Sequence, residues 1–229
     1  MDSTSPDLSA GTIKQIKSKE RVSTHGEVFT ADREVNAMLD LVKQETERID
    51  SRFLEPACGN GNFLAKILER KLAIVRKQYK KTRTDYELYA LVSVSSIYGV
   101  DIQMDNVQEC RDRLFKIFEQ EYKSLFTNSQ TEIYLESIRY ILKRNILWGD
   151  ALTLKTPDGL KPIIFSEWTA ISSSTGMINR RDFTLNELLE CSPLEGINLF
   201  SDLGDDVFIP TPIKEYPLTH YLKLSEYAE

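Results

Sequence analysis

The sequence predicts an α/β fold in which helices flank a mostly parallel sheet. The first reason is the succession of a short strand, a turn with two glycines and a helix over residues 52–72, which is how a βαβ unit begins. The second is that three predicted strands each lead into an acidic residue, namely Glu55, Asp101 and Asp150. With 229 residues, of which 41% are hydrophobic and 28% charged, the chain is long enough to bury one sizeable core.

The N-terminal part of the sequence predicts an arm, a helix and the first βα unit. Residues 1–20 are polar and lack a hydrophobic period, so we expect a flexible arm. Beyond Thr30, a candidate N-cap, apolar residues fall on one face of a helix that ends near residue 47. A strand at 52–55 then leads through a turn at 57–62 into a second helix from residue 63 onward.

The next hundred residues continue this alternation of helices and strands. A basic segment at 77–85 interrupts the second helix, and we expect a solvated helix end there, with a DNA contact as the alternative. The hydrophobic pattern then predicts, in order, a helix at 86–94, a strand at 96–101, helices at 107–125 and 131–143, and strands at 145–148 and 161–168. We expect the last of these to be the fourth strand of the sheet.

The C-terminal part of the sequence carries a weaker signal. It holds four of the eight prolines, which interrupt regular elements. We expect a loop at 172–176, a short helix at 182–190, a strand near 206–209 and a short helix from residue 219. The expected organisation is a flexible arm at 1–20, a central domain at 21–170 and an irregular C-terminal extension at 171–229 that packs on the same domain.

Composition and charge argue against several classes of protein. A formal charge of −6 provides no general cationic surface, so a contact with nucleic acid needs a local patch or another subunit. The apolar stretches are too short for a membrane span and the N-terminus lacks an apolar signal segment, so we expect a cytoplasmic protein with no membrane contact. Cys58, Cys110 and Cys191 are widely spaced and match no zinc pattern, so we expect free thiols and no metal.

The acidic residues and glycines that follow the strands predict a ligand site. Ligands of open α/β sheets bind beyond the carboxyl ends of the strands, where Gly59 and Gly61 let the backbone approach closely. Leu64 replaces the third glycine of a dinucleotide fingerprint, so a pyrophosphate is less favoured. Asp101 can accept hydrogen bonds from a ribose, and Asp150 from an adenine amine. A ligand with an amino-acid end, a ribose and an adenine is S-adenosylmethionine.

Four segments, at 25–30, 53–64, 98–102 and 145–152, form an ordered set of motifs. These motifs resemble those of the adenine-specific (N6) DNA methyltransferases of restriction-modification systems. The segment FLEPACGNGNFL at 53–64 resembles the first cofactor motif of that family. HGEVFT at 25–30 resembles the upstream Gly-x-x-Phe-Thr-Pro element, with Ala31 in place of proline. YGVDI at 98–102 and NILWGDAL at 145–152 resemble the second and third motifs. The motifs stand in the order found in type I modification subunits, in which the cofactor motifs come first and target recognition follows.

The resemblance implies a Rossmann-like S-adenosylmethionine-dependent methyltransferase fold, with residues 21–170 as the cofactor-binding domain. It places Phe29 and Thr30 near the methionine moiety and Asp101 at the ribose. The remaining implied cofactor contacts are Glu55, Ala57, Gly59 and Gly61 around the amino and carboxyl groups, Ile102 packed on the adenine, and Asp150 at its amine. The implied partner is DNA, bound together with a separate specificity or nuclease subunit.

Five of these residues also have a plain structural explanation. Gly59 and Gly61 can form a tight strand-to-helix turn without a ligand. Asp101 can cap a helix, Asp150 can be an ordinary turn residue, and Phe29 can be a core aromatic. Cys58, which stands in the same turn, is interpreted as a packing residue with no catalytic role.

The sequence departs from the family at the catalytic tetrapeptide, an Asp or Asn followed by Pro-Pro and an aromatic residue. The chain contains no Pro-Pro pair, and the expected place, after PIIF at 162–165, has Glu167 and Trp168. These two could form a substituted site in which Trp168 stacks on a base and Glu167 accepts its amine; a packed tryptophan is the favoured explanation. No catalytic residue is therefore assigned, and the C-terminal strands of the fold are expected to be truncated or irregular.

Three functions remain open at this point. The chain is expected to be an enzyme that transfers a methyl group to the exocyclic amine of adenine in DNA. The first alternative is a catalytically inactive cofactor-binding or regulatory subunit of a restriction or phage-defence complex. The second is a methyltransferase for an acceptor other than DNA, since one fold serves many acceptors.

Overall fold

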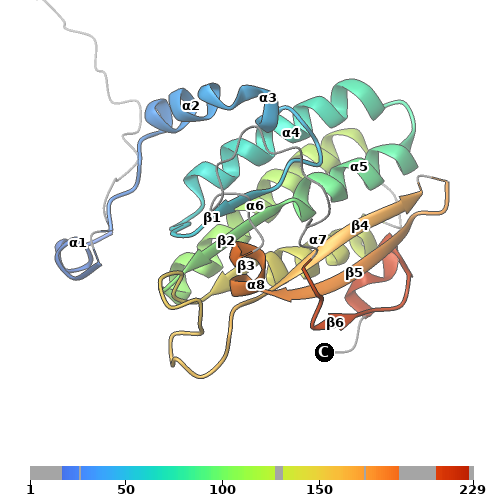
Figure 1. The fold of residues 1–229 in the computed structure, drawn as a ribbon. Helices are drawn as coiled ribbons and strands as arrows, with labels where there is room; N and C mark the ends of the chain where they lie inside the picture. Colours follow the sequence, from blue (N-terminus) through green and yellow to red (C-terminus); the bar gives the residue numbers. More distant parts are fainter. Residues whose placement is uncertain (1–16, 26, 127–130, 173, 191–209, 227–229) are drawn as a thin grey trace, which may run out of the picture.

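The computed structural model describes residues 17–25, 27–126, 131–172, 174–190 and 210–226. A three-stranded parallel sheet lies at the centre, with long helices on one side and an antiparallel hairpin on the other (Figure 1). The larger hydrophobic core lies among the helices. A smaller core joins Tyr98 and Val100 of the parallel sheet to Phe165 and Leu185 of the hairpin region.

The parallel sheet confirms the predicted α/β arrangement over residues 53–148. Its strands β1 (Phe53–Glu55), β2 (Ile97–Asp101) and β3 (Ile146–Trp148) pair in the order β1-β2-β3. All five residues of the central strand β2 are buried, as the continuous apolar pattern predicts. Because parallel strands end at the same edge, the residues that follow β1, β2 and β3 come together there.

Four helices connect these strands and cover one face of the sheet. They are α4 (Asn62–Tyr79) and α5 (Arg83–Ser95) between β1 and β2, and α6 (Met104–Leu125) and α7 (Thr131–Asn145) between β2 and β3. Their apolar stripes form the main core, including Leu64, Leu68, Leu91, Val94, Leu114, Ile138 and Ile141. The predicted interruption in the basic segment is confirmed, because α4 ends at Tyr79 and α5 begins at Arg83.

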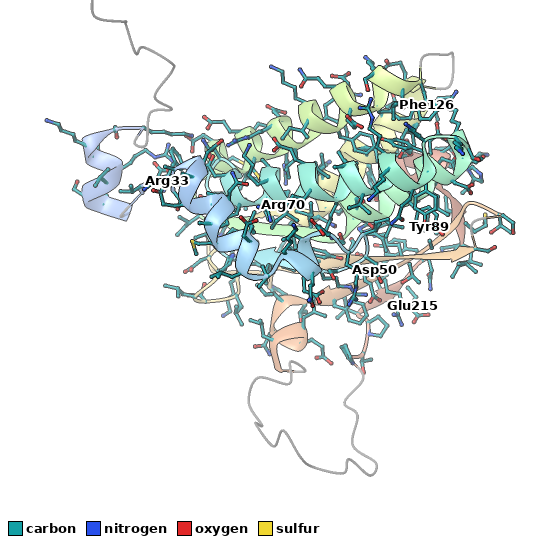
Figure 2. All side chains as sticks on the ribbon, turned by 90° about the horizontal axis from the view of Figure 1, so that it is seen from above. Arg33, Asp50, Arg70, Tyr89, Phe126 and Glu215 are labelled. Carbon is teal, nitrogen blue, oxygen red and sulfur yellow. The ribbon has the colours of Figure 1, made fainter. Side chains whose placement is uncertain are left out.

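The N-terminal helices differ in detail from the prediction. They are α1 (Lys19–His25), α2 (Asp32–Leu41) and the short α3 (Lys43–Thr46). Thr30 is not the N-cap; Ala31 holds that position and makes no side-chain cap, and the Thr30 carbonyl instead accepts a hydrogen bond of 2.9 Å from Asn62 Nδ2. Seen from above, α2 lies over α4 at the end of the molecule marked by Arg33 (Figure 2).

The expected fourth strand of the parallel sheet is wrong. Residues of that segment form β4 (Ile164–Ser172), which pairs in antiparallel register with β5 (Met177–Thr184). β5 also pairs with β6 (Lys214–Glu215) and β7 (Thr219–His220). Among the described strands, β1 therefore has only β2 as a neighbour.

The C-terminal elements were predicted only in part. The expected helix at 182–190 begins later, as α8 (Leu185–Glu190), because residues 182–184 belong to β5. The expected helix from residue 219 follows β7 as a 3-10 helix, η2 (Tyr221–Glu226), and the expected strand near 206–209 lies outside the described residues. A buried ion pair stabilises the hairpin: Arg180 donates to both carboxylate oxygens of Asp182 at 2.9 and 2.8 Å.

Candidate functional site

A pocket of about 510 Å³ lies at the carboxyl ends of the three parallel strands. This volume is in the range of small-molecule sites. Four segments contribute its walls: residues 27–29 before α2, the turn after β1, the start of α6 with the residues before it, and the loop after β3. The lining residues are Glu27, Val28, Phe29, Pro56, Ala57, Gly59, Asp101, Ile102, Gln103, Asn106, Gly149, Asp150, Ala151 and Leu152.

Six of the nine predicted cofactor residues line this pocket, namely Phe29, Ala57, Gly59, Asp101, Ile102 and Asp150. They come from positions separated by more than a hundred residues, and the strand ends bring them together. The other three do not line the pocket: Thr30 and Glu55 are chain neighbours of lining residues, and Gly61 lies two residues after Gly59. Burial raises the pKa of Glu55, against a weaker opposing effect of the Ala57 N–H.

The turn after β1 needs both of its glycines. Gly59 and Gly61 have φ values of +51° and +83°, in the left-handed region that disfavours side chains. A Cβ at Gly59 would lie 3.0 Å from the Phe29 ring, and one at Gly61 would lie 2.7 Å from Cys110 Sγ. Gly59 thus lets the backbone face the pocket beside Phe29, and Gly61 lets α4 begin against α6.

Asp101 is the central acceptor of the pocket. Its carboxylate accepts hydrogen bonds from the backbone N–H groups of Gly59 and Gln103, each at 2.8 Å, and from Asn106 Nδ2 at 3.2 Å. The helix N-cap is Gln103, so the simple capping explanation for Asp101 does not describe this arrangement. These donors fix the carboxylate, and a carboxylate oxygen has lone pairs left for further donors such as hydroxyl groups.

Asp150 has the local role of a turn residue as well as a place in the pocket wall. It accepts the Leu152 backbone N–H at 2.9 Å, and this hydrogen bond lowers the pKa of its carboxyl group. Nearby, Trp148 Nε1 donates to the Ile102 carbonyl at 2.9 Å and so ties the end of β3 to the segment after β2. Phe29 is 8% exposed, so the expectation of a core aromatic and that of a pocket residue both describe it.

Glu27, Gln103 and Asn106 are polar lining residues that the sequence did not predict. Asn106 Nδ2 donates to Glu27 Oε1 at 2.5 Å and also to Asp101, so it joins two carboxylates in the pocket wall. Asn106 stands in the first turn of the helix that follows an acid-ended strand, which is the signal that could have identified it. Glu27 lies within the HGEVFT element at 25–30, but at a position that the element leaves unspecified, and 79 residues separate it from Asn106.

The described pocket wall carries acidic groups and no basic ones. Glu27, Asp101 and Asp150 line it, and no lysine or arginine is among the described lining residues. Such a wall favours ligands with positive charge or hydroxyl donors over ligands with phosphate groups. Phosphate groups, which basic, glycine-rich loops bind, therefore do not suit this pocket wall.

The substituted catalytic site built from Glu167 and Trp168 is wrong. Trp168 is buried, and its Nε1 donates to Asn145 Oδ1 at 3.0 Å. Glu167 forms ion pairs with Arg52 and Arg181. Neither residue lines the pocket, so the packed tryptophan is the correct explanation.

The basic segment lies away from the pocket. α4 begins beside the pocket at Asn62 and runs to Tyr79, so Lys80 and Lys81 lie at the opposite end of the helical layer. That end is marked by Tyr89 and Phe126 in Figure 2. A solvated helix end is the explanation that this position supports.

The described cysteines are packing residues, and the described residues form no metal-ligand cluster. Cys58 and Cys110 are free and buried; their mutual hydrogen bond and burial raise the pKa of Cys58, as befits packing residues. Cys191 lies outside the described residues. In the described part of the chain, no group of three or more potential ligands could hold a metal ion, and no helix is both long and apolar enough to span a membrane.

A comparison with known proteins points to restriction-modification systems. The chain is 26% identical over 148 residues to a protein of Methanocaldococcus jannaschii named "Putative type II restriction enzyme and methyltransferase". This chain is therefore similar to a restriction-modification methyltransferase. The aligned part covers 63% of this chain and 12% of that protein, so the chain spans about one eighth of its relative. No family model matches, and no solved structure matches.

Proposed function

We propose that this chain binds S-adenosylmethionine in the pocket at the strand ends. We propose further that it acts as a DNA adenine methyltransferase of a restriction-modification system. The similarity to a restriction enzyme and methyltransferase supports the system, and the motifs at 25–30, 53–64, 98–102 and 145–152 support the adenine-specific, type I-like assignment. The acceptor, the exocyclic amine of adenine in DNA, belongs to the proposal.

The observation that carries the proposal is the acidic, glycine-floored pocket. S-adenosylmethionine has a sulfonium and an ammonium group, one carboxylate, a ribose and an adenine. Asp101 offers acceptors to the ribose hydroxyls, Asp150 offers one to the adenine amine, and Ile102 offers an apolar surface to the base. A nucleotide with two or three phosphates would instead meet only carboxylates among the described charged groups of the wall.

The residues present fit this cofactor. Gly59 leaves free the space that a side chain would occupy at the turn, and Phe29 packs beside it. In the proposed complex Ala57 and Gly59 contact the methionine part, with Thr30, Glu55 and Gly61 supporting that contact from outside the lining. When bound, the cofactor supplies a methyl group activated by its sulfonium; the chain's own residues hold it and orient it toward the edge of the sheet.

A second function, a cofactor-binding subunit without catalysis of its own, is favoured by the course of β4. In the family, the acceptor-holding tetrapeptide follows the fourth strand, and here that segment turns into a hairpin with Glu167 and Trp168 in internal contacts. In this version, DNA and the acceptor-holding residues come with another subunit, such as a specificity or nuclease subunit.

Binding variants test the cofactor proposal. We expect Asp101→Ala to weaken binding of labelled S-adenosylmethionine about tenfold or more, because it removes the acceptor of a charge-assisted hydrogen bond. Asp150→Ala should weaken it less, and Asp158→Ala is a matched control because Asp158 accepts the Leu160 N–H at 3.0 Å in a similar turn that does not line the pocket. Equal binding by all three variants would refute the assignment.

Methyl-transfer assays separate the two functions. The protein is incubated with labelled cofactor and mixed-sequence DNA, alone and with a candidate specificity or nuclease subunit. Transfer by the chain alone would establish the enzyme. Cofactor binding without methyl transfer, both alone and with the second subunit, would support the inactive cofactor-binding subunit, and transfer with the second subunit present would count against it.

A further inference from the structure

We propose that Arg21 is a positioning residue for the cofactor pocket: it ties α1 to the first turn of α6 and thereby fixes the wall segment at 27–29. This inference rests on the proposed cofactor binding. It adds a residue, and a salt-dependent control of affinity, that neither the motifs nor the similarity assigns.

The wall segment at 27–29 lacks internal support. It lies between α1 and α2 and belongs to no helix or strand. On its C-terminal side it is held where Asn62 Nδ2 donates to the Thr30 carbonyl at 2.9 Å. On its N-terminal side the Glu27 backbone N–H donates to the Arg21 carbonyl at 3.4 Å, a long hydrogen bond. The shorter described contacts run through the Glu27 side chain, so the position of the wall depends largely on the partners of that carboxylate.

Arg21 is the charged partner of Glu27. Its Nε lies 2.6 Å from Glu27 Oε2, and the Glu27 side chain is only 10% exposed. The same guanidinium lies 2.5 and 3.1 Å from the two carboxylate oxygens of Asp105, in the forked geometry that arginine forms with carboxylates. Lys17 adds contacts of 3.1 Å to Asp105 and 2.7 Å to Glu109. One arginine thus joins α1, the pocket wall and α6.

The network continues to the proposed ribose acceptor. Asn106 Nδ2 donates both to Glu27 Oε1 at 2.5 Å and to Asp101 Oδ1 at 3.2 Å. Lys17 Nζ also donates to Asn106 Oδ1 at 2.7 Å, so the Asn106 side chain is held from both of its amide atoms. If Glu27 moves, Asn106 loses one of these partners, and its hydrogen bond to Asp101, one of the three described donors to that carboxylate, is weakened. Arg21 therefore acts on the ligand through Glu27 and Asn106, without lining the pocket itself.

The network is exposed enough to respond to salt. The side chains of Arg21 and Asp105 are 21% and 50% exposed. Ion pairs of this kind weaken as ionic strength rises, because the screening length falls to a few ångströms near 1 M salt. Cofactor affinity should consequently contain a salt-dependent part that originates in Arg21.

The test compares charge reversal at Arg21 with charge reversal at a matched arginine. Arg76 pairs with Glu121 at 3.2 Å, and Glu121 belongs to α6, as Asp105 does, but at the helix end away from the pocket. We expect Arg21→Glu to weaken S-adenosylmethionine binding about five- to tenfold, and Arg76→Glu to change it less than about twofold. Unfolding curves should show that both variants remain folded.

Two further readouts distinguish positioning from a general structural effect. The double variant Arg21→Glu with Asp105→Arg should bind more tightly than the product of the two single effects predicts, because an ion pair re-forms. Raising sodium chloride from about 0.05 M to about 0.5 M should weaken binding more in the wild type than in Arg21→Met. Added cofactor should also slow hydrogen exchange of the α1 amides, since coupling is reciprocal.

The outcomes separate this inference from the proposed function. If the wild type binds S-adenosylmethionine and Arg21→Glu binds equally well, the positioning role is refuted and the cofactor site stands. The positioning role is also refuted if the loss of cofactor affinity in the double variant equals the product of the two single losses. Equal losses of affinity in Arg21→Glu and Arg76→Glu refute it as well. A wild type that does not bind the cofactor overturns both.

Discussion

Gly61 is a position at which one added methyl group should have a large local cost. Its φ of +83° is left-handed, and an added Cβ would lie 2.7 Å from Cys110 Sγ. Alanine in the left-handed region costs about 1–2 kcal/mol. Forcing extra volume into a packed core adds about 1–3 kcal/mol. We therefore expect Gly61→Ala to lower the free energy of unfolding by about 2–5 kcal/mol.

Gly159 provides the matched control for this prediction. Its φ is +73°, and no atom lies within 4 Å of an ideal Cβ there. Gly159→Ala should therefore pay only the conformational part, about 1–2 kcal/mol. Urea unfolding of both variants measures the difference, which isolates the contact with Cys110.

A double-variant cycle completes the assay. Cys110→Ala removes the sulfur that the new methyl group would meet, so it should cost less in the Gly61→Ala background than in the wild type. The reasoning fails if the two glycine variants lose equal stability. It also fails if the effects of Gly61→Ala and Cys110→Ala simply add.

Three further predictions concern buried polar groups. Arg180→Met leaves the Asp182 carboxylate without its ionic partner, so we expect a loss of about 3–5 kcal/mol in chemical unfolding, and a loss below about 1 kcal/mol would contradict this. Tyr221→Phe removes a hydrogen bond of 2.6 Å to Glu87 and should cost about 1–3 kcal/mol; an unchanged unfolding midpoint would refute it. Burial lowers the pKa of Lys71 from 10.5 to about 7 in the folded protein. At pH values between these two, the unfolded chain therefore binds one more proton than the folded chain does. Stability should then rise with pH across that interval, by at most about 1.4 kcal/mol per pH unit, and the rise should be absent in Lys71→Met.

The parallel half of the fold could be predicted because its signals are local. The apolar run of β2, the glycines before α4 and the stripes of the long helices lie within single segments. The parallel pairing then follows, since helices of this length connect strands that run in the same direction. The acids at the strand ends therefore identified the edge where the pocket lies.

The hairpin could not be predicted because its strands are stabilised by distant contacts. β5 has the sequence MINRRDFT, in which the charged residues predict a surface turn or the start of a helix. In the fold, Arg180 and Asp182 are buried as a pair. Arg180 Nη1 donates to the Tyr140 hydroxyl at 2.6 Å, and the guanidinium lies 5.7 Å from the centre of the Tyr140 ring. Nothing in the local pattern marks these charges as internal.

The same limit applies to the site. Asp101 and Gly59 were predicted because they end or follow a strand. Glu27 and Asn106 complete the wall through a contact between segments 79 residues apart, which no local pattern encodes. Pockets built at strand ends are thus predictable on the strand side and less so on the side supplied by remote segments.

The most direct test of the central claim is a calorimetric titration of the purified protein with S-adenosylmethionine and, separately, with ATP. The acidic pocket predicts binding of the first with a dissociation constant near the micromolar range, about −8 kcal/mol, and no measurable binding of the second. Absence of binding by S-adenosylmethionine, or equally tight binding of ATP, would contradict the account.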